Sequence, residues 1–123
     1  MKSAPELLRE AYAAFNLRDI DGVLALMRAD VDWPNGMEGG RVHGQEEVRA
    51  YWTRQWATVD PHVEPVRIVE GGPDEAVVEV HQVVRDLAGK ILMNQVVQHV
   101  YRIRDGLIER MDIREPAAGA GTV

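Results

Sequence analysis

Two histidines, a glutamate and a glutamine in the C-terminal half of the chain are the residues best suited to proton-transfer chemistry. His81 and His99 lie in valine-rich segments, and Glu79 and Gln95 lie close to them in sequence. An imidazole that is desolvated by valines and held by a carboxylate can act as a general acid or base near neutral pH, for example on a carbonyl or enol substrate. Whether these four side chains form one site depends on how their strands pair.

The stretch that carries these residues, from Glu75 to Arg114, predicts three antiparallel strands joined by two tight turns. We expect the strands at 76–85, 91–104 and 107–114. The sequences DLAG and DG between them are typical of a turn with a left-handed glycine and of a β-hairpin.

The pairing register decides which side chains share a face of this sheet, since a slip of one residue turns every side chain over. If each turn is a three-residue type I turn with a glycine bulge, Asp86 pairs with Lys90 and Ile103 with Leu107. Two-residue turns would split the apolar residues between the faces, so the bulged turns are preferred. One face then carries Glu79, His81, Gln95, Val97, His99, Tyr101, Met111 and Ile113. The other carries Val78, Val80, Val84, Val96 and Val100. Because both faces are apolar, we expect helices to cover the first and a second copy of the chain to cover the second.

Two other interpretations of the histidines remain open. Either histidine could be a hydrogen-bonded residue of the sheet with no chemical role, which is the usual state of a lone histidine. Together with Glu79 they could also bind a metal, because imidazole and carboxylate groups ligate zinc and non-haem iron. The spacing of His81 and His99 matches no specific metal motif and further convergent ligands are not evident, so no metal site is predicted.

Composition narrows the classes of partner. The chain has 123 residues, enough for one domain with its own core. Its net charge of −6 argues against a nucleic-acid partner, and its lack of cysteine excludes disulfides and thiolate sites. The N-terminus has charges inside its apolar pattern and no apolar run approaches a membrane span, so we expect a cytoplasmic protein without a membrane partner.

Helices are predicted before the strands. A capping box at Ser3 and Glu6 begins a helix that ends near Leu17, and a second helix is expected up to Asp30. The stripe of large apolar residues in 45–59 predicts a third.

Short extended segments flank this third helix, at 31–34 and, with alternating polarity, at 62–70. The resulting order ααβαβββ predicts an α+β fold, in which three N-terminal helices pack on the concave face of a curved, cone-shaped antiparallel sheet. Residues 1–114 form the single domain and 115–123 a flexible C-terminal tail.

A cone of this kind tends to enclose a pocket. The residues expected to line it are Tyr12, Phe15, Trp33, Trp52, Trp56, Gln95, Val97, Tyr101, Met111 and Ile113. Aromatic residues at helical spacing are also typical of a plain hydrophobic core.

Three segments carry a resemblance to a known family: YAAFNLRDIDGVLALMRADVDWP at 12–34, RVHGQEEVRAYW at 41–52 and HVYRIRDGLIERMDI at 99–113. The chain resembles the nuclear transport factor 2-like superfamily, in its branch of ketosteroid isomerases and SnoaL-like polyketide cyclases. The resemblance implies a deep apolar pocket between sheet and helices, and homodimers built on the opposite sheet face.

The catalytic residues of that branch do not all carry over. Its isomerases use a carboxylate base with a tyrosine and a protonated aspartate. Here the helix-one tyrosine falls on Ala11, beside Tyr12, and the base falls on Trp33. The aspartate of the cyclases falls on Ile113, beside Asp112. Neither activity is therefore transferred.

From these observations we expect a homodimer whose pocket binds a small hydrophobic molecule. As an enzyme it would be an isomerase, cyclase or hydratase that moves a proton on a carbonyl compound, with His99 or His81 as the proton carrier and no cofactor. The alternative is a non-catalytic ligand-binding or dimerisation module of the same fold. An open cavity that touches His99 and Trp33 favours the first interpretation, and a filled cone favours the module.

Overall fold

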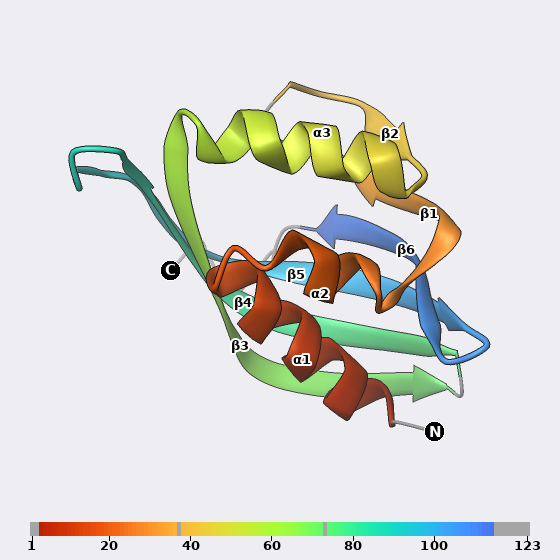
Figure 1. Cartoon of the computed structure of the whole chain (residues 1–123). Helices are drawn as coiled ribbons and strands as arrows, with labels where there is room; N and C mark the ends of the chain where they lie inside the picture. The colour runs from red at the N-terminus through yellow and green to blue at the C-terminus, as the bar shows by residue number, and fades with distance from the viewer. Residues whose placement is uncertain (1–2, 37, 73, 115–123) are drawn as a thin grey trace.

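Three helices pack over one face of a curved six-stranded sheet (Figure 1). The computed structural model describes residues 3–36, 38–72 and 74–114. The elements are α1 (Ala4–Asn16), α2 (Ile20–Leu24), β1 (Met27–Pro34), β2 (Arg41–His43), α3 (Gln45–Trp56), β3 (Val59–Gly72), β4 (Glu75–Asp86), β5 (Ile91–Arg104) and β6 (Leu107–Arg114). Across the sheet the strands run in the order β2-β1-β6-β5-β4-β3, and every neighbouring pair is antiparallel except β1 and β6.

The predicted α+β class is confirmed, with two more strands than the expected order contained. The first is β2, in a segment that was expected only to lead into the third helix. The second is β3, which grows out of the alternating segment 62–70. The predicted tail, 115–123, lies outside the described residues.

Helix α1 begins and ends with side-chain hydrogen bonds that fix it on the sheet. The predicted capping box is present, since Ser3 Oγ accepts from the backbone N–H of Glu6 and the Glu6 carboxylate accepts from that of Ser3. At the other end, the amide of Asn16 donates to the carbonyl of Val63 at 2.8 Å and accepts from its N–H at 3.0 Å. Asn16 thus takes the place of a strand neighbour for the edge strand β3, and Tyr12 is held over the concave face. No helix within the described residues is long and apolar enough to cross a membrane.

The second and third helices are shorter than predicted. Helix α2 ends at Leu24, and Met27 already belongs to β1, where it pairs with Ile108 of β6. Gly22 lowers the helix propensity of this segment, and the backbone bond from Ile108 N to the carbonyl of Leu26 commits the chain to the sheet. Helix α3 likewise ends at Trp56, three residues before the predicted end.

The first hairpin, between β4 and β5, starts as predicted and then changes register. The backbone N–H of Asp86 donates to the carbonyl of Lys90 at 2.8 Å, which confirms the predicted turn. Beyond the turn, Arg85 pairs with Ile91 but Val84 pairs with Met93, so one residue of β5, Leu92, is a bulge. Such an extra residue turns over the rest of one strand relative to the other.

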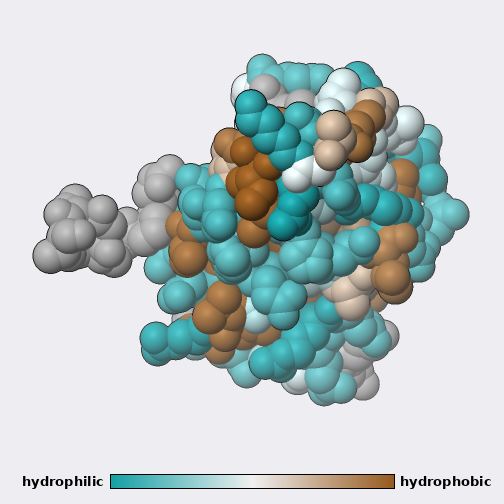
Figure 2. All heavy atoms as spheres, turned by 90° about the vertical axis from the view of Figure 1, so that its left-hand side faces the viewer, coloured by the Kyte–Doolittle hydropathy of each residue, from teal (hydrophilic) through white to brown (hydrophobic). Residues whose placement is uncertain are grey.

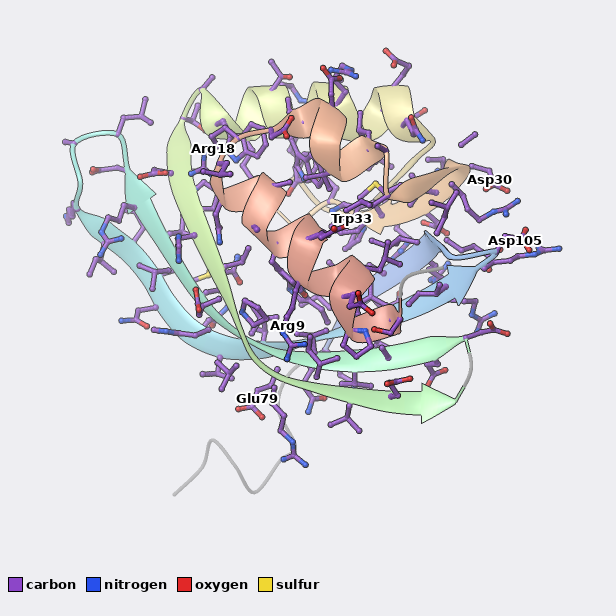
Figure 3. All side chains as sticks on the ribbon, turned by 60° about the horizontal axis from the view of Figure 1, so that its bottom comes forward. Arg9, Arg18, Asp30, Trp33, Glu79 and Asp105 are labelled. Atoms are coloured by element: carbon purple, nitrogen blue, oxygen red, sulfur yellow. The ribbon has the colours of Figure 1, made fainter. Side chains whose placement is uncertain are left out.

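The predicted faces of β4 were therefore wrong. Val78 and Val80 lie under the helices with no exposed surface, and Val84 lies on the same concave side. Glu79 and His81 lie on the outer face, and Figure 3 shows Glu79 pointing away from the helices. Of the predicted outer-face valines, only Val96 and Val100 of β5 lie there.

The second hairpin, between β5 and β6, uses a two-residue turn instead of the predicted three-residue turn. Asp105 and Gly106 have φ values of 55° and 76°, as in a type I′ turn, and Ile103 pairs with Ile108 instead of Leu107. A bulge at Glu109 then shifts the register again.

This second shift returns the rest of β6 to the expected side of the sheet. Met111 pairs with Tyr101 and Ile113 with His99, so all four share the concave face as predicted.

An arginine from β2 bridges the irregular junction between β1 and β6. The register of this parallel pair shifts between Met27 and Asp32. The guanidinium of Arg41 donates to the carboxylates of Asp32 and Asp112 at 2.5 and 3.0 Å, and to the carbonyls of Asp32 and Met111 at 3.2 and 2.6 Å. Arg110 binds the same two carboxylates at 2.6 and 2.9 Å. These charge-assisted bonds satisfy polar groups that the strand ladder leaves unpaired.

We predict that Arg41→Met lowers the free energy of unfolding by about 2 kcal/mol, because the bonds to both carboxylates and both carbonyls are lost together. Urea denaturation followed by circular dichroism measures this change. Arg49→Met is the matched control, since Arg49 only pairs with the exposed Asp21 and Glu46 on the surface and surface pairs contribute little. Equal midpoints for the two variants would contradict a bridging role for Arg41.

Candidate functional site

A cavity of about 510 Å³ lies between the concave face of the sheet and the helices. Nine of the ten residues predicted to line it border this cavity: Tyr12, Phe15, Trp33, Trp52, Gln95, Val97, Tyr101, Met111 and Ile113. Figure 3 shows Trp33 between the helices and the sheet. The cone is therefore open inside, and the cavity touches both His99 and Trp33.

Trp56 is the predicted lining residue that does not border the cavity. It packs behind Trp52, with ring centroids 5.8 Å apart, and the guanidinium of Arg18 lies 5.0 Å from its ring. Its indole nitrogen is buried without a hydrogen-bond partner among the described residues. Trp56 thus supports the wall and does not form its surface.

The cavity has a buried end and an exposed end. Tyr12, His99 and Tyr101 retain only 4%, 6% and 2% of their accessible surface, whereas Met93 and Ile113 retain 42% and 45%. Met93 belongs to the β4–β5 hairpin, which projects beyond the helices (Figure 1). Viewed from that side, apolar surface is exposed in patches among polar residues (Figure 2). The lining of the cavity is therefore exposed near the hairpin and buried at the opposite end.

Three buried polar side chains form a hydrogen-bonded chain at the buried end. The hydroxyl of Tyr101 donates to that of Tyr12 at 2.8 Å, and the Tyr12 hydroxyl lies 2.8 Å from Nδ1 of His99. The rings of Tyr12 and His99 are also stacked, with centroids 5.9 Å apart. Residues 99 and 101 share the inward face because side chains alternate along β5.

The direction of these hydrogen bonds determines which nitrogen of His99 carries the proton. With Tyr101 as the donor to Tyr12, the proton of Tyr12 goes to Nδ1 of His99, and the tautomer that accepts it carries its own proton on Nε2. Nε2 has no hydrogen-bond partner among the described residues, and His99 borders the cavity. We therefore assign an N–H donor at Nε2 that a bound molecule can use.

Burial keeps all three groups uncharged near neutral pH. Desolvation lowers the pKa of His99 to about 4. It also raises the pKa of Tyr12 well above its usual value, with a further contribution from Tyr101, and burial raises the pKa of Tyr101. His99 was predicted to have a pKa near neutrality, but its burial keeps the imidazole uncharged at neutral pH.

The structure does not bring the predicted catalytic residues together. Glu79 and His81 lie on the outer face, where Nε2 of His81 is 2.6 Å from Oδ1 of Asn94, while His99 lies inside. The partner that orients His99 is Tyr12 instead of a carboxylate. Tyr12 was predicted to line the pocket, but its bond to β5 depends on helix packing, which no local sequence signal reveals.

Asp112 is the one carboxylate among the described residues that border the cavity. Its bonds to Arg110, and then to Arg41, lower its pKa below the usual range. It is therefore ionised and already engaged. Within the described part of the chain, no three histidine, aspartate or glutamate side chains are grouped to hold a metal ion.

Comparisons with known proteins agree with the fold described above. The sequence profile of the SnoaL-like domain matches residues 8–111. An NTF2-like protein of unknown function from Burkholderia pseudomallei is 29% identical, with a TM-score of 0.81 over 97% of this chain and 95% of that one. TerC, co-crystallised with polyporic acid, is 28% identical, with a TM-score of 0.79 over 93% and 92% of the two chains. A Mycobacterium tuberculosis protein in complex with estradiol-17beta-hemisuccinate shares the fold at 22% identity, with a TM-score of 0.80 over 94% and 96%. No curated protein matches the sequence.

We predict that burial of neutral His99 makes the protein less stable in mild acid. Because the folded-state pKa of about 4 lies below the ordinary value of 6.5, the unfolded chain takes up a proton in this interval that the folded chain does not. The free energy of unfolding should therefore fall from pH 6.5 to pH 4, by ~3 kcal/mol from this group alone.

The variant His99→Asn isolates this effect, since its side-chain amide can still bond to Tyr12 but does not titrate. Its free energy of unfolding relative to that of the wild type should rise as the pH falls, as measured by denaturant unfolding at several pH values. His81→Asn on the outer face keeps His99 and should follow the wild-type slope. Parallel curves for the wild type and His99→Asn would show that His99 does not resist protonation.

Proposed function

The chain belongs to the SnoaL-like domain family, and on that premise we propose that its cavity binds a small, largely apolar molecule with an oxygen that accepts a hydrogen bond from Nε2 of His99. The observation that carries this proposal is the chain of bonds from Tyr101 through Tyr12 to His99 at the buried end of the cavity. A buried donor without a protein partner is costly unless a ligand or water satisfies it. The site is thus prepared for an oxygen acceptor.

The size and walls of the cavity support an apolar, flat ligand. A volume of about 510 Å³ lies within the range of small-molecule sites. Trp33 stands perpendicular to Trp52 at 5.6 Å and lies 6.3 Å from Tyr101, so the walls offer both faces and edges of aromatic rings. The crystal of TerC with polyporic acid supports a small-molecule ligand for a chain of this similarity.

The chemistry that this donor favours is polarisation of a carbonyl group. A preorganised N–H in a water-poor site stabilises negative charge that develops on the oxygen of an enol or enolate. An isomerase, cyclase or hydratase that acts on a carbonyl compound requires this stabilisation. With a pKa of about 4, His99 serves as the donor in this scheme and not as the base at neutral pH. Because Asp112 is already bonded to Arg41 and Arg110, the proton acceptor would be a group of the substrate itself.

The alternative of a module without a ligand is not favoured. It requires a cone filled by side chains, whereas the cavity is open and borders His99 and Trp33. A binding protein that performs no reaction would use the same donor and the same walls. Ligand recognition is therefore the part of the proposal that both versions share.

We predict that the wild-type protein binds 4-acetylbiphenyl about fivefold more tightly than 4-ethylbiphenyl, because only the acetyl oxygen accepts from His99. In His99→Phe this preference should vanish while the affinity for 4-ethylbiphenyl is kept. Isothermal titration calorimetry measures all four affinities, and His81→Phe on the outer face is the control that should keep the preference. If His99→Phe still prefers the acetyl compound, the donor lies elsewhere.

We also propose that the outer face of the sheet pairs with a second copy of the chain. Val69 and Val96 are 45% and 40% exposed on this face, and Val77 and Val100 lie half-buried beside Val69 across the strands. An apolar row of this kind supports a protein interface. The register change means that Val78, Val80 and Val84 take no part in it.

Val96→Lys places a charge on this face and should shift a dimer toward monomer, as measured by sedimentation velocity at a series of concentrations. Thr53→Lys adds the same charge at an exposed position of α3 and should leave the association unchanged. A wild-type chain that sediments as a monomer at every concentration would refute the interface.

A further inference from the structure

A pair of glutamines interrupts the apolar lining of the cavity. On the inward face of the sheet, Gln82 of β4 lies directly opposite Gln95 of β5. The neighbouring inward pair toward the buried end is Val80 with Val97, and the neighbouring pair toward the hairpin tip is Val84 with Met93. Gln82 is half-buried and Gln95 is exposed, so the two amides lie between two apolar pairs near the open end of the cavity.

These two side-chain amides make almost no hydrogen bonds within the described residues. Gln82 is half-buried and makes no hydrogen bond through its side chain within the described residues. The amide of Gln95 donates only to the sulfur of Met93, at 3.2 Å, and thioether sulfur is a weak acceptor. Opposed residues of a strand pair have their Cβ atoms about 5 Å apart. Two amides with free donors and acceptors therefore converge on the same part of the cavity.

We propose that Gln82 and Gln95 bind a second, uncharged oxygen of the ligand, a hydroxyl or a carbonyl at the end opposite to the oxygen bound by His99. This inference rests on the proposed function of the cavity and adds the polarity of the far end of the ligand. His99 lies four residues from Gln95 on the same face of β5, which places the two polar positions roughly 13 Å apart along the strand. A rigid skeleton of about two linked rings, with an oxygen at each end, suits this separation.

The surrounding charges favour an uncharged group at the amide pair. Arg41 is the one cationic side chain among the described residues that border the cavity, and its guanidinium is occupied by two carboxylates and two carbonyls. A carboxylate at the far end of the ligand would lie beside two neutral amides without a counter-ion. An apolar end would cover the amides and leave them unsatisfied, which disfavours ligands that lack the second oxygen.

The test compares 4-acetylbiphenyl with its 4′-hydroxy and 4′-carboxy derivatives, by isothermal titration calorimetry. The wild-type protein should bind the hydroxy compound about fivefold more tightly than the unsubstituted one, as expected for one net hydrogen bond, and should bind the carboxylate less tightly than the hydroxy compound. In the double variant with Gln82→Leu and Gln95→Leu, the hydroxyl advantage should disappear, because the hydroxy compound loses its hydrogen bond and 4-acetylbiphenyl no longer leaves two amides unsatisfied. Gln98→Leu changes the same residue type on the outer face of β5 and should preserve the advantage.

The outcomes separate this inference from the proposed function. If the wild type binds 4-acetylbiphenyl with the preference that depends on His99 but gains nothing from the hydroxyl, the assignment of the glutamines is wrong and the donor at His99 stands. The assignment is also overturned if the double variant keeps the hydroxyl advantage, or if the carboxylate binds most tightly. If the wild type binds none of the three compounds, both proposals fail.

Discussion

The register between β4 and β5 is the constraint on which the candidate site depends. Leu92 is the extra residue in β5 that brings Val84 opposite Met93. From Val84 back to Glu75, this pairing decides on which face of the sheet each side chain of β4 lies. Val78 and Val80 are thereby placed against the helices, and Gln82 is placed in the cavity beside Gln95. Without the bulge, the outward residues Glu79 and His81 would face α1, and burial of a carboxylate there would cost far more than burial of valine. The apolar core and the composition of the cavity wall thus have one common cause.

The hydrogen-bonded chain links the packing of α1 to the chemistry of the cavity. Tyr12 is fixed because α1 is capped at Ser3 and tied to β3 through Asn16. The same packing that excludes water from Tyr12 and His99 lowers the pKa of the imidazole and makes Tyr12 the orienting partner of Nδ1. Burial of a neutral His99 at the cavity wall is therefore expected to cost stability in acid. Such a local conflict with stability is expected at a functional site.

Local signals predicted the parts of the fold that local interactions determine. The capping box at Ser3 and the turn at Asp86 depend on neighbouring residues, and both appeared as predicted. The bulges at Leu92 and Glu109 have no such signal, because they depend on how β4, β5 and β6 pair with one another across the sheet. Most of the cavity lining was predictable, since large apolar residues line a cone wherever they fall on its concave face. The grouping of Glu79, His81 and His99 was not predictable, since it depended on a register shift of one residue. Gln82 lies opposite Gln95, where His81 was expected, and Tyr12 is the partner of His99.

Different polar interactions are found at the buried end of the cavity and at the junction of β1 and β6, and they determine which groups a ligand can contact. At the buried end, hydrogen bonds join Tyr101 to Tyr12 and Tyr12 to His99. Near the junction of β1 and β6, Arg41 and Arg110 form ion pairs with Asp32 and Asp112, so neither carboxylate is free to act as a base. What remains available to a ligand is uncharged: an imidazole N–H at one end and two amides nearer the hairpin. Under our proposal, such a cavity orients a ligand by directional hydrogen bonds instead of net charge, and its selectivity depends on the spacing of oxygens along β5. Because inward positions alternate along each strand, a bulge that exchanges one set of recognition groups for another also changes which side chains of that strand form the core.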